Sequence, residues 1–91
     1  MDEDIITNHA GFEARRRNIK EDFVKYVILN AQQKLYYGDR RVIVQNRYHD
    51  EIEGKEMLIR VIGIEIEEVF RVATVYKTSR IEKYWKKEDE A

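Results

Sequence analysis

The pattern of apolar and polar positions predicts two helices in the first third of the chain. The segment from about Lys20 to Asn30 spaces its apolar residues three and four positions apart and carries acidic residues in its first turn. The segment TNHAGFEARRR, residues 7–17, is also helical in character. Asn18 suits the left-handed conformation that ends a helix, or it can form a capping pair with Glu21. Both interpretations predict a break between two helices near position 18.

After these helices the pattern becomes that of β-strands. The run KLYYGDRRVIVQNRYH predicts two strands around a Gly38–Asp39 turn, because its apolar residues are largely β-branched or aromatic. A polar turn around Gly54 precedes MLIRVIGIEIE, which is apolar on both faces early and alternates later, as in a central strand. VFRVATVYK predicts the fourth strand. Sequential strands joined by short turns favour an antiparallel meander.

The end of the chain predicts a short third helix. Ser79 and Glu82 form an S-x-x-E capping box, and the aromatic residues Tyr84 and Trp85 follow on one face together with Ile81. The predicted fold class is therefore α+β: two N-terminal helices packed on a four-stranded antiparallel meander, with a short C-terminal helix. We expect residues 1–91 to form a single domain with an ordered core from about 6 to 87.

Composition narrows the functional classes. The 91 residues suit one domain, and 43% apolar residues exclude a disordered chain. Seventeen cationic residues balance eighteen acidic ones, so any basic site must come from local clustering. The sequence has no cysteine, which excludes disulfides and thiolate metal sites and fits a cytoplasmic location. No apolar run is long enough to span a membrane, and the amino terminus does not have the pattern of a secretory signal.

The strongest local cluster lies at residues 76–87. Five cations stand against one acid, Glu82, and aromatic residues are interleaved with them. Phosphate pairing and base stacking by such residues are typical of single-stranded RNA binding. A core-facing aromatic stripe with a solvated lysine face gives the same pattern, and composition alone favours that second interpretation. The cations are Lys77, Arg80, Lys83, Lys86 and Lys87, and the aromatic residues are Tyr76, Tyr84 and Trp85.

His9 and Arg60 are further candidates. His9 starts the first predicted helix, with Glu13 and Arg17 following at i+4 and i+8, and an imidazole can take a proton from a ribose 2′-hydroxyl. An exposed histidine beside an ordinary surface ion pair gives the same pattern. Arg60 shares a predicted strand face with apolar residues and needs an anion, because an unpaired buried charge is very costly. Its partner is either a structural carboxylate, such as Glu13 or Asp39, or the phosphate of a ligand.

Other chemistry has no matching pattern. The sequence contains no phosphate-binding glycine loop and no His/Cys spacing for zinc. We therefore expect no metal and no cofactor, and any catalysis would be metal-independent acid–base chemistry.

Three segments together resemble a known family. His9-Ala10 followed by Arg17-Asn18-Ile19 and Val24 is similar to an "HA…RGI…V" opening, Leu58 and Arg60-Val61 to an "LLRVV" strand, and Thr74–Trp85 to a "TVY-TSKI-KYW" ending. This chain thus resembles a family of small bacterial and archaeal domains of unknown function, grouped with RelE/ParE-like toxins of the barnase–EndoU–colicin–RelE ribonuclease fold. The resemblance implies helices packed on an antiparallel sheet, with RNA at the face of the sheet and an antitoxin protein as a partner.

The first hypothesis is therefore a metal-independent endoribonuclease-like toxin of a toxin–antitoxin pair. His9 would act as general acid or base, the two arginines would stabilise the phosphate, and the tyrosines would position or stack a base. The alternatives are a non-catalytic RNA- or protein-binding module, and a structural or homodimerising domain whose aromatic residues are core. The candidate catalytic residues are His9, Arg17, Arg60, Tyr76 and Tyr84, and the candidate RNA-binding residues are Thr78, Ser79, Arg80 and Lys83.

Overall fold

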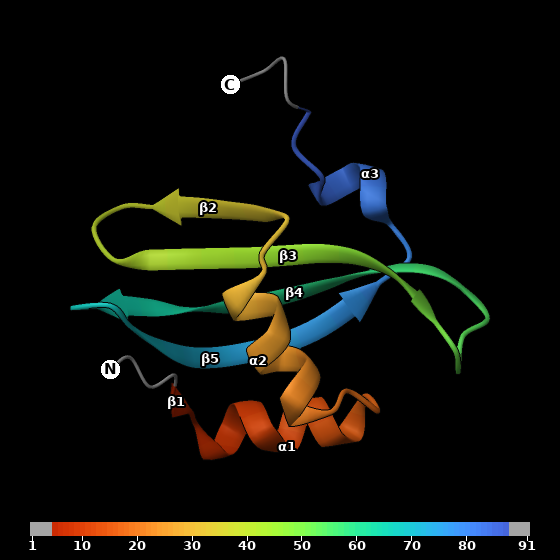
Figure 1. Cartoon of the computed structure of the whole chain (residues 1–91), viewed down its shortest axis with the longest axis horizontal. Helices are drawn as coiled ribbons and strands as arrows, with labels where there is room; N and C mark the ends of the chain where they lie inside the picture. The colour runs from red at the N-terminus through yellow and green to blue at the C-terminus, as the bar shows by residue number, and fades with distance from the viewer. Residues whose placement is uncertain (1–4, 88–91) are drawn as a thin grey trace.

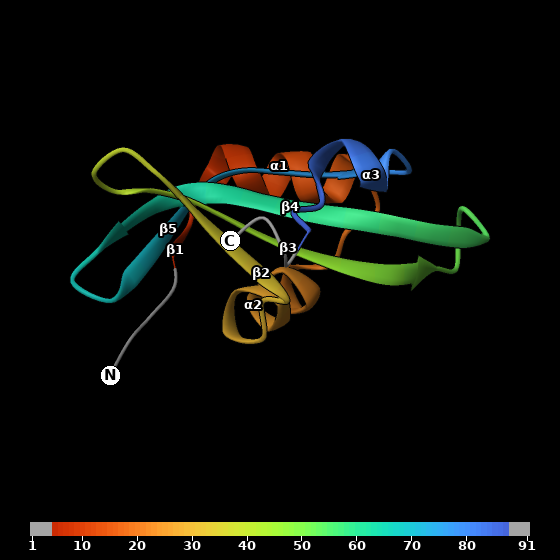
Figure 2. The same ribbon diagram turned by 90° about the horizontal axis from the view of Figure 1, so that it is seen from above.

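A single five-stranded sheet organises the protein (Figure 1). The computed structural model describes residues 5–87. Helix α2 lies over one face of the sheet, α1 runs along the edge formed by β5, and α3 lies on the side away from α2 (Figures 1 and 2). The elements are β1 (Ile5–Ile6), α1 (Asn8–Arg16), α2 (Glu21–Leu29), β2 (Gln33–Tyr37), β3 (Arg41–Asp50), β4 (Lys55–Ile66), β5 (Val69–Thr78) and α3 (Ile81–Tyr84).

The order of strands is β1-β5-β4-β3-β2, with β1 parallel to β5 and the other pairs antiparallel. The α+β class is confirmed, but a four-stranded antiparallel meander as the whole sheet is wrong: the sheet is five-stranded and mixed. Strand β1 has only two residues, too few to show an alternating pattern. It pairs with Arg71 and Val72, and the Thr7 hydroxyl donates to the Val72 carbonyl oxygen at 2.9 Å.

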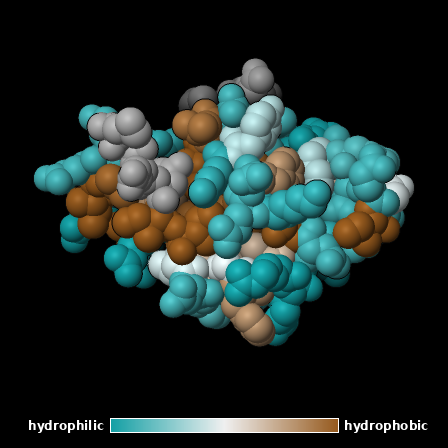
Figure 3. Space-filling model, turned by 60° about the horizontal axis from the view of Figure 1, so that its bottom comes forward, coloured by the Kyte–Doolittle hydropathy of each residue, from teal (hydrophilic) through white to brown (hydrophobic). Residues whose placement is uncertain are grey.

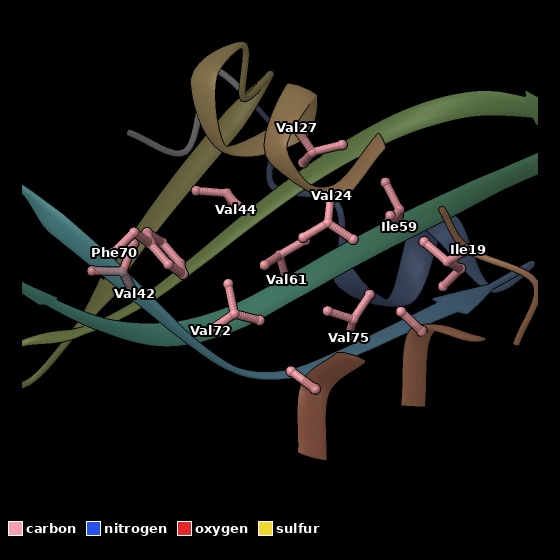
Figure 4. Close-up of a cluster of buried hydrophobic side chains, with 12 residues drawn as sticks. Ile19, Val24, Val27, Val42, Val44, Ile59, Val61, Phe70, Val72 and Val75 are labelled. Carbon is pink, nitrogen blue, oxygen red and sulfur yellow. The ribbon is translucent and has the colours of Figure 1, made fainter. Parts of the chain in front are cut away.

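The hydrophobic core lies between the sheet and the first two helices (Figure 4). Alternate residues of the three central strands point toward the helices, as the two-residue period of a strand requires. The other face of the same strands carries a different set of side chains, which includes Arg60. The core residues are Ala10, Ala14, Ile19, Val24, Val27, Val42, Val44, Ile59, Val61, Phe70, Val72 and Val75.

The predicted break between the helices is confirmed. Asn18 adopts a left-handed conformation with φ of 59°, which ends α1 and turns the chain into α2. Helix α1 begins at a capping residue, Thr7, whose side-chain oxygen accepts the backbone N–H of Ala10 at 3.2 Å. The turn allows both helices to pack on the same core.

A close backbone approach lies in the middle of the sheet. The pairing of β4 with β5 shifts register between Ile62 and Gly63. A Cβ atom at Gly63 would lie 2.1 Å from the carbonyl oxygen of Arg71 and 2.7 Å from the ring of Phe70. Only glycine fits where two backbones come this close.

On the face of the molecule drawn in Figure 3, apolar side chains gather toward one end and hydrophilic side chains cover much of the remainder. None of the helices within residues 5–87 has the length and apolar character needed to cross a membrane.

Candidate functional site

A buried arginine lies at the centre of the sheet face that is turned away from the core. Arg60 of β4 pairs in register with Gln45 of β3 on one side and with Tyr76 of β5 on the other, so the three side chains lie in a row across the sheet. Gln45 is fully buried, and Arg60 is only 6% exposed. The pairing of three strands therefore holds a guanidinium group at a fixed position.

The partners of this guanidinium are neutral. Its Nε donates to Gln45 Oε1 at 2.9 Å and its Nη1 donates to the Tyr76 hydroxyl at 2.7 Å. The ring centroid of Tyr84 lies 4.2 Å from its Cζ, a cation–π contact. Within residues 5–87 no carboxylate forms an ion pair with Arg60. The described residues therefore hold the positive charge of Arg60 in place without neutralising it.

The predicted structural partners of Arg60 do not contact it. Glu13 forms an ion pair with Arg17 instead, and Asp39 lies in the turn between β2 and β3. No buried side-chain nitrogen or oxygen in the described part of the chain lacks a hydrogen-bond partner. Among the described residues Nη2 of Arg60 has no hydrogen-bond partner, which makes it the atom of this guanidinium that a ligand anion would bind.

Two glutamines hold the closing segment over Arg60. Gln45 Nε2 donates to Gln33 Oε1 at 2.7 Å and to the Tyr84 carbonyl oxygen at 3.1 Å. Gln33 in turn binds the backbone of Lys86 at both its N–H and its carbonyl oxygen. Helix α3 has no buried residue, so these amide contacts and the tyrosine ring fix its position rather than an apolar interface. The sequence pattern of charged and aromatic residues does not identify either glutamine.

The predicted capping box at the start of α3 is wrong. Arg80 is the residue before the helix, and no side chain caps it. The backbone N–H of Arg80 instead donates to Thr78 Oγ1 at 3.0 Å. Ser79 and Arg80 are exposed, and Lys83 places its Nζ 5.3 Å from the centroid of the Tyr84 ring. The candidate RNA-binding residues thus follow directly from β5 along the rim of the Arg60 site.

The two tyrosines have opposite pKa shifts. Burial raises the pKa of Tyr76, even though its bond from Arg60 acts in the other direction. The hydroxyl of Tyr76, and then the positive charges of Lys83 and Arg60, lower the pKa of Tyr84. The ring centroids lie 6.3 Å apart. The site therefore holds one phenol that gives up its proton more readily than the other.

The structure does not bring His9 and Arg17 to this cluster. Both belong to the α1 region, which packs against the outer side of β5, so β5 lies between them and Arg60 on β4 (Figure 1). His9 is exposed at the start of the helix. Arg17 lies at its end, on a separate hollow that Lys77 and Ser79 also line. Of the five candidate catalytic residues, only Arg60, Tyr76 and Tyr84 share one site.

Lys77 belongs to the folded framework rather than to the basic surface. Its Nζ lies 2.9 Å from Asp50 Oδ2, and the side chains of the pair are 9% and 7% exposed. Burial alone would raise the pKa of Asp50, but bonds from the Glu53 amide, Lys77 and Tyr48 outweigh it and hold this pKa well below its ordinary value. The pair joins the end of β3 to β5 next to the site.

Comparison of the chain with protein-family models, curated proteins and solved structures finds no match. Within the described residues, no group of three or more histidines and acidic residues is placed to hold a metal ion.

Proposed function

We propose that the protein binds single-stranded RNA at the sheet face that carries Arg60, Tyr76 and Tyr84. One observation carries the proposal: a buried guanidinium has only neutral hydrogen-bond partners among the described residues, and none of them binds its Nη2. Burying an ion in a protein interior costs roughly several kcal/mol unless its charge is compensated. A phosphate at Nη2 would supply that compensation, and arginine binds phosphate oxygens in a fixed fork geometry.

The surroundings of Arg60 favour RNA over a small anion. Tyr84 and Trp85 present flat rings, and Arg80, Lys83 and Lys87 are exposed cations along the same segment. Phosphate contacts together with base stacking are the two contributions that bind single strands. The protein as a whole carries a formal net charge of −1, so the attraction must be local to this face.

Binding is tested by fluorescence anisotropy of a labelled, uncleavable 2′-O-methyl RNA oligonucleotide. Arg60→Gln should weaken binding by about tenfold or more, because a charge-assisted hydrogen bond is lost. The slope of log affinity against log salt should fall by about 0.7, the value for one phosphate contact on a single strand. Arg71→Gln is the matched control, because Arg71 is an exposed arginine near the opposite end of the sheet. Equal affinities for wild type and Arg60→Gln would refute the proposal.

The second candidate function is metal-independent RNA cleavage at the same place, favoured by the tyrosine pair. Two titratable groups whose environments push their pKa values apart suit a base and an acid. Tyr84 as the phenolate would take the proton of a 2′-hydroxyl, whose oxygen attacks the phosphorus. Tyr76 would protonate the departing 5′-oxygen, and Arg60 would stabilise the charge on the phosphoryl oxygens. The products are a 2′,3′-cyclic phosphate and a free 5′-hydroxyl.

Cleavage is tested with unmodified RNA in the presence of a chelator. Tyr84→Phe and Tyr76→Phe should each lower the rate by about 100-fold or more, the usual contribution of acid–base catalysis, while retaining affinity for 2′-O-methyl RNA. His9→Ala is the control, because the structure places His9 away from the site. RNA that remains intact with the wild-type protein would leave binding as the function.

The resemblance to RelE-like toxins adds an antitoxin partner in the cytoplasm to the proposal. Expression together with the product of a neighbouring reading frame tests it. Stable co-purification and a protected Arg60 face in hydrogen exchange are expected, and separate elution of the two proteins would contradict it.

A further inference from the structure

A second binding feature lies beside α3. It is an open cleft of about 920 Å³, within the usual size range of ligand sites. Residues from β3, β4 and the closing segment surround it, and four of them are cationic against two carboxylates. The lining residues are Arg47, Glu56, Ser79, Arg80, Ile81, Glu82, Lys83, Trp85 and Lys87.

A tryptophan and an arginine form one wall of this cleft. The Cζ of Arg47 lies 5.4 Å from the centroid of the Trp85 ring, a cation–π contact. Glu56 holds the guanidinium through Nη2 at 3.0 Å, so the group is oriented although it is exposed. Aromatic rings and guanidinium planes are the two kinds of surface on which unpaired RNA bases stack.

The cleft lies beside the Arg60 site. Lys83 lines the cleft and also lies over the Tyr84 ring, which in turn covers Arg60. On the strand beneath, Arg47 lies two residues after Gln45 and on the same face, a distance of about 7 Å. An extended polynucleotide that places one phosphate at Arg60 therefore brings a neighbouring nucleotide to the cleft.

We infer that this cleft is a nucleobase subsite, which takes one unpaired base of the RNA strand against Trp85 and Arg47. Lys83 and the other cations at its rim contact the phosphates on either side of that base. The inference rests on the proposed function and adds a selection to it: a base must be unpaired to enter, so single strands bind and duplexes do not.

Trp85 is the only tryptophan of the chain, so its fluorescence reports on the cleft alone. The full chain is titrated with three probes of equal length: a single-stranded 2′-O-methyl oligoadenosine, the same backbone without bases, and a 2′-O-methyl duplex. Binding of each probe is measured independently by anisotropy. We expect the oligoadenosine to quench Trp85 emission by about half or more, whereas the abasic backbone binds through its phosphates without quenching.

A variant separates stacking from nearby binding. Trp85→Ala should weaken oligoadenosine binding about fivefold or more, the loss expected for one base–aromatic stack, and leave the abasic backbone unaffected. Tyr26→Ala is the control, because Tyr26 is an exposed aromatic on α2, on the other side of the sheet. Thermal melts by circular dichroism establish that both variants are folded.

The outcomes for the two proposals are distinct. Oligoadenosine that binds without changing Trp85 emission, or quenching that is equal for the abasic backbone or the duplex, overturns the base subsite and leaves RNA binding intact. If none of the three probes binds, the proposed function fails and the subsite fails with it.

Discussion

The buried Asp50–Lys77 pair gives the sharpest prediction about stability. The Asp50 carboxylate accepts from the Tyr48 hydroxyl at 2.7 Å, from the backbone N–H groups of Ile52 and Glu53 at 2.9 Å each, and from Lys77 at 2.9 Å. Asp50→Asn keeps the shape of the side chain but removes its charge. Lys77 is then left as a buried ammonium without an anion.

The expected cost follows from that arrangement. Removing one partner of a buried pair lowers the free energy of unfolding by about 3–5 kcal/mol. Since asparagine retains one acceptor oxygen, we expect a loss at the lower end of this range, about 3 kcal/mol at pH 7. For a domain of this size each kcal/mol lowers the melting temperature by roughly 4–8 °C. The double variant Asp50→Asn, Lys77→Met removes both charges and should recover much of the loss.

The pH dependence has a definite sign. The folded-state pKa of Asp50 is depressed, so its stabilisation is fully present above the unfolded-state pKa of about 3.9 and is lost as the pH falls below it. The assay is urea unfolding of wild type and the three variants, including Lys77→Met, between pH 7 and pH 3, followed by circular dichroism. Wild type should lose about 1 kcal/mol of its advantage over Asp50→Asn by pH 3 and keep the rest, because the folded-state pKa lies lower still. A loss below about 1 kcal/mol at pH 7, or additive effects in the double variant, would refute the reasoning.

Three further predictions concern other parts of the fold. Gly63→Ala should destabilise the protein by about 1–3 kcal/mol, because the new methyl group meets backbone atoms. Gly11→Ala should stabilise it by about 0.5–1 kcal/mol, because a Cβ atom has room at this position of α1. Urea unfolding measures both changes, and equal effects of the two variants would contradict the packing argument. Gln33→Ala should release the Lys86 backbone, seen as faster hydrogen exchange in α3 with unchanged exchange in the core; unchanged exchange in α3 would show that the glutamine does not hold it. Tyr84 should ionise below the ordinary tyrosine pKa of about 10, measured as the difference between the ultraviolet titrations of wild type and Tyr84→Phe, and a difference centred at or above about 10 would exclude this shift.

The helices and the four longer strands could be predicted because their patterns are local. Apolar spacing placed α2 within a residue or two of its observed bounds, and the tolerance of asparagine for positive φ located the break at Asn18. Strand β1 could not be predicted, because its pairing with β5 depends on residues far along the chain. The S-x-x-E pattern was misleading at Ser79, since β5 continues to Thr78 and the residue before α3 is Arg80, whose own N–H bonds the Thr78 hydroxyl.

The candidate site, too, could be predicted only in part from the sequence. Chemistry identified Arg60, Tyr76 and Tyr84, whose strand register brings the first two together across neighbouring strands. His9 was grouped with them by hypothesis and lies away from them in the structure, because helical periodicity describes one face of α1 but not where α1 docks. Gln45 was missed since an uncharged strand residue shows its role only when Arg60 is seen beside it.

The parallel pairing of β1 with β5 has a consequence for how the protein forms during translation. Thr7 bonds to a carbonyl oxygen 65 positions later, and the entropy of closing so long a loop is only repaid once β5 exists. Until the ribosome has released β5, Ala10 and Ala14 have no strand on which to pack. Tyr76 emerges with the end of β5 and Tyr84 later still, so a growing chain exposes an incomplete core first and acquires its ligand face only at the end of synthesis.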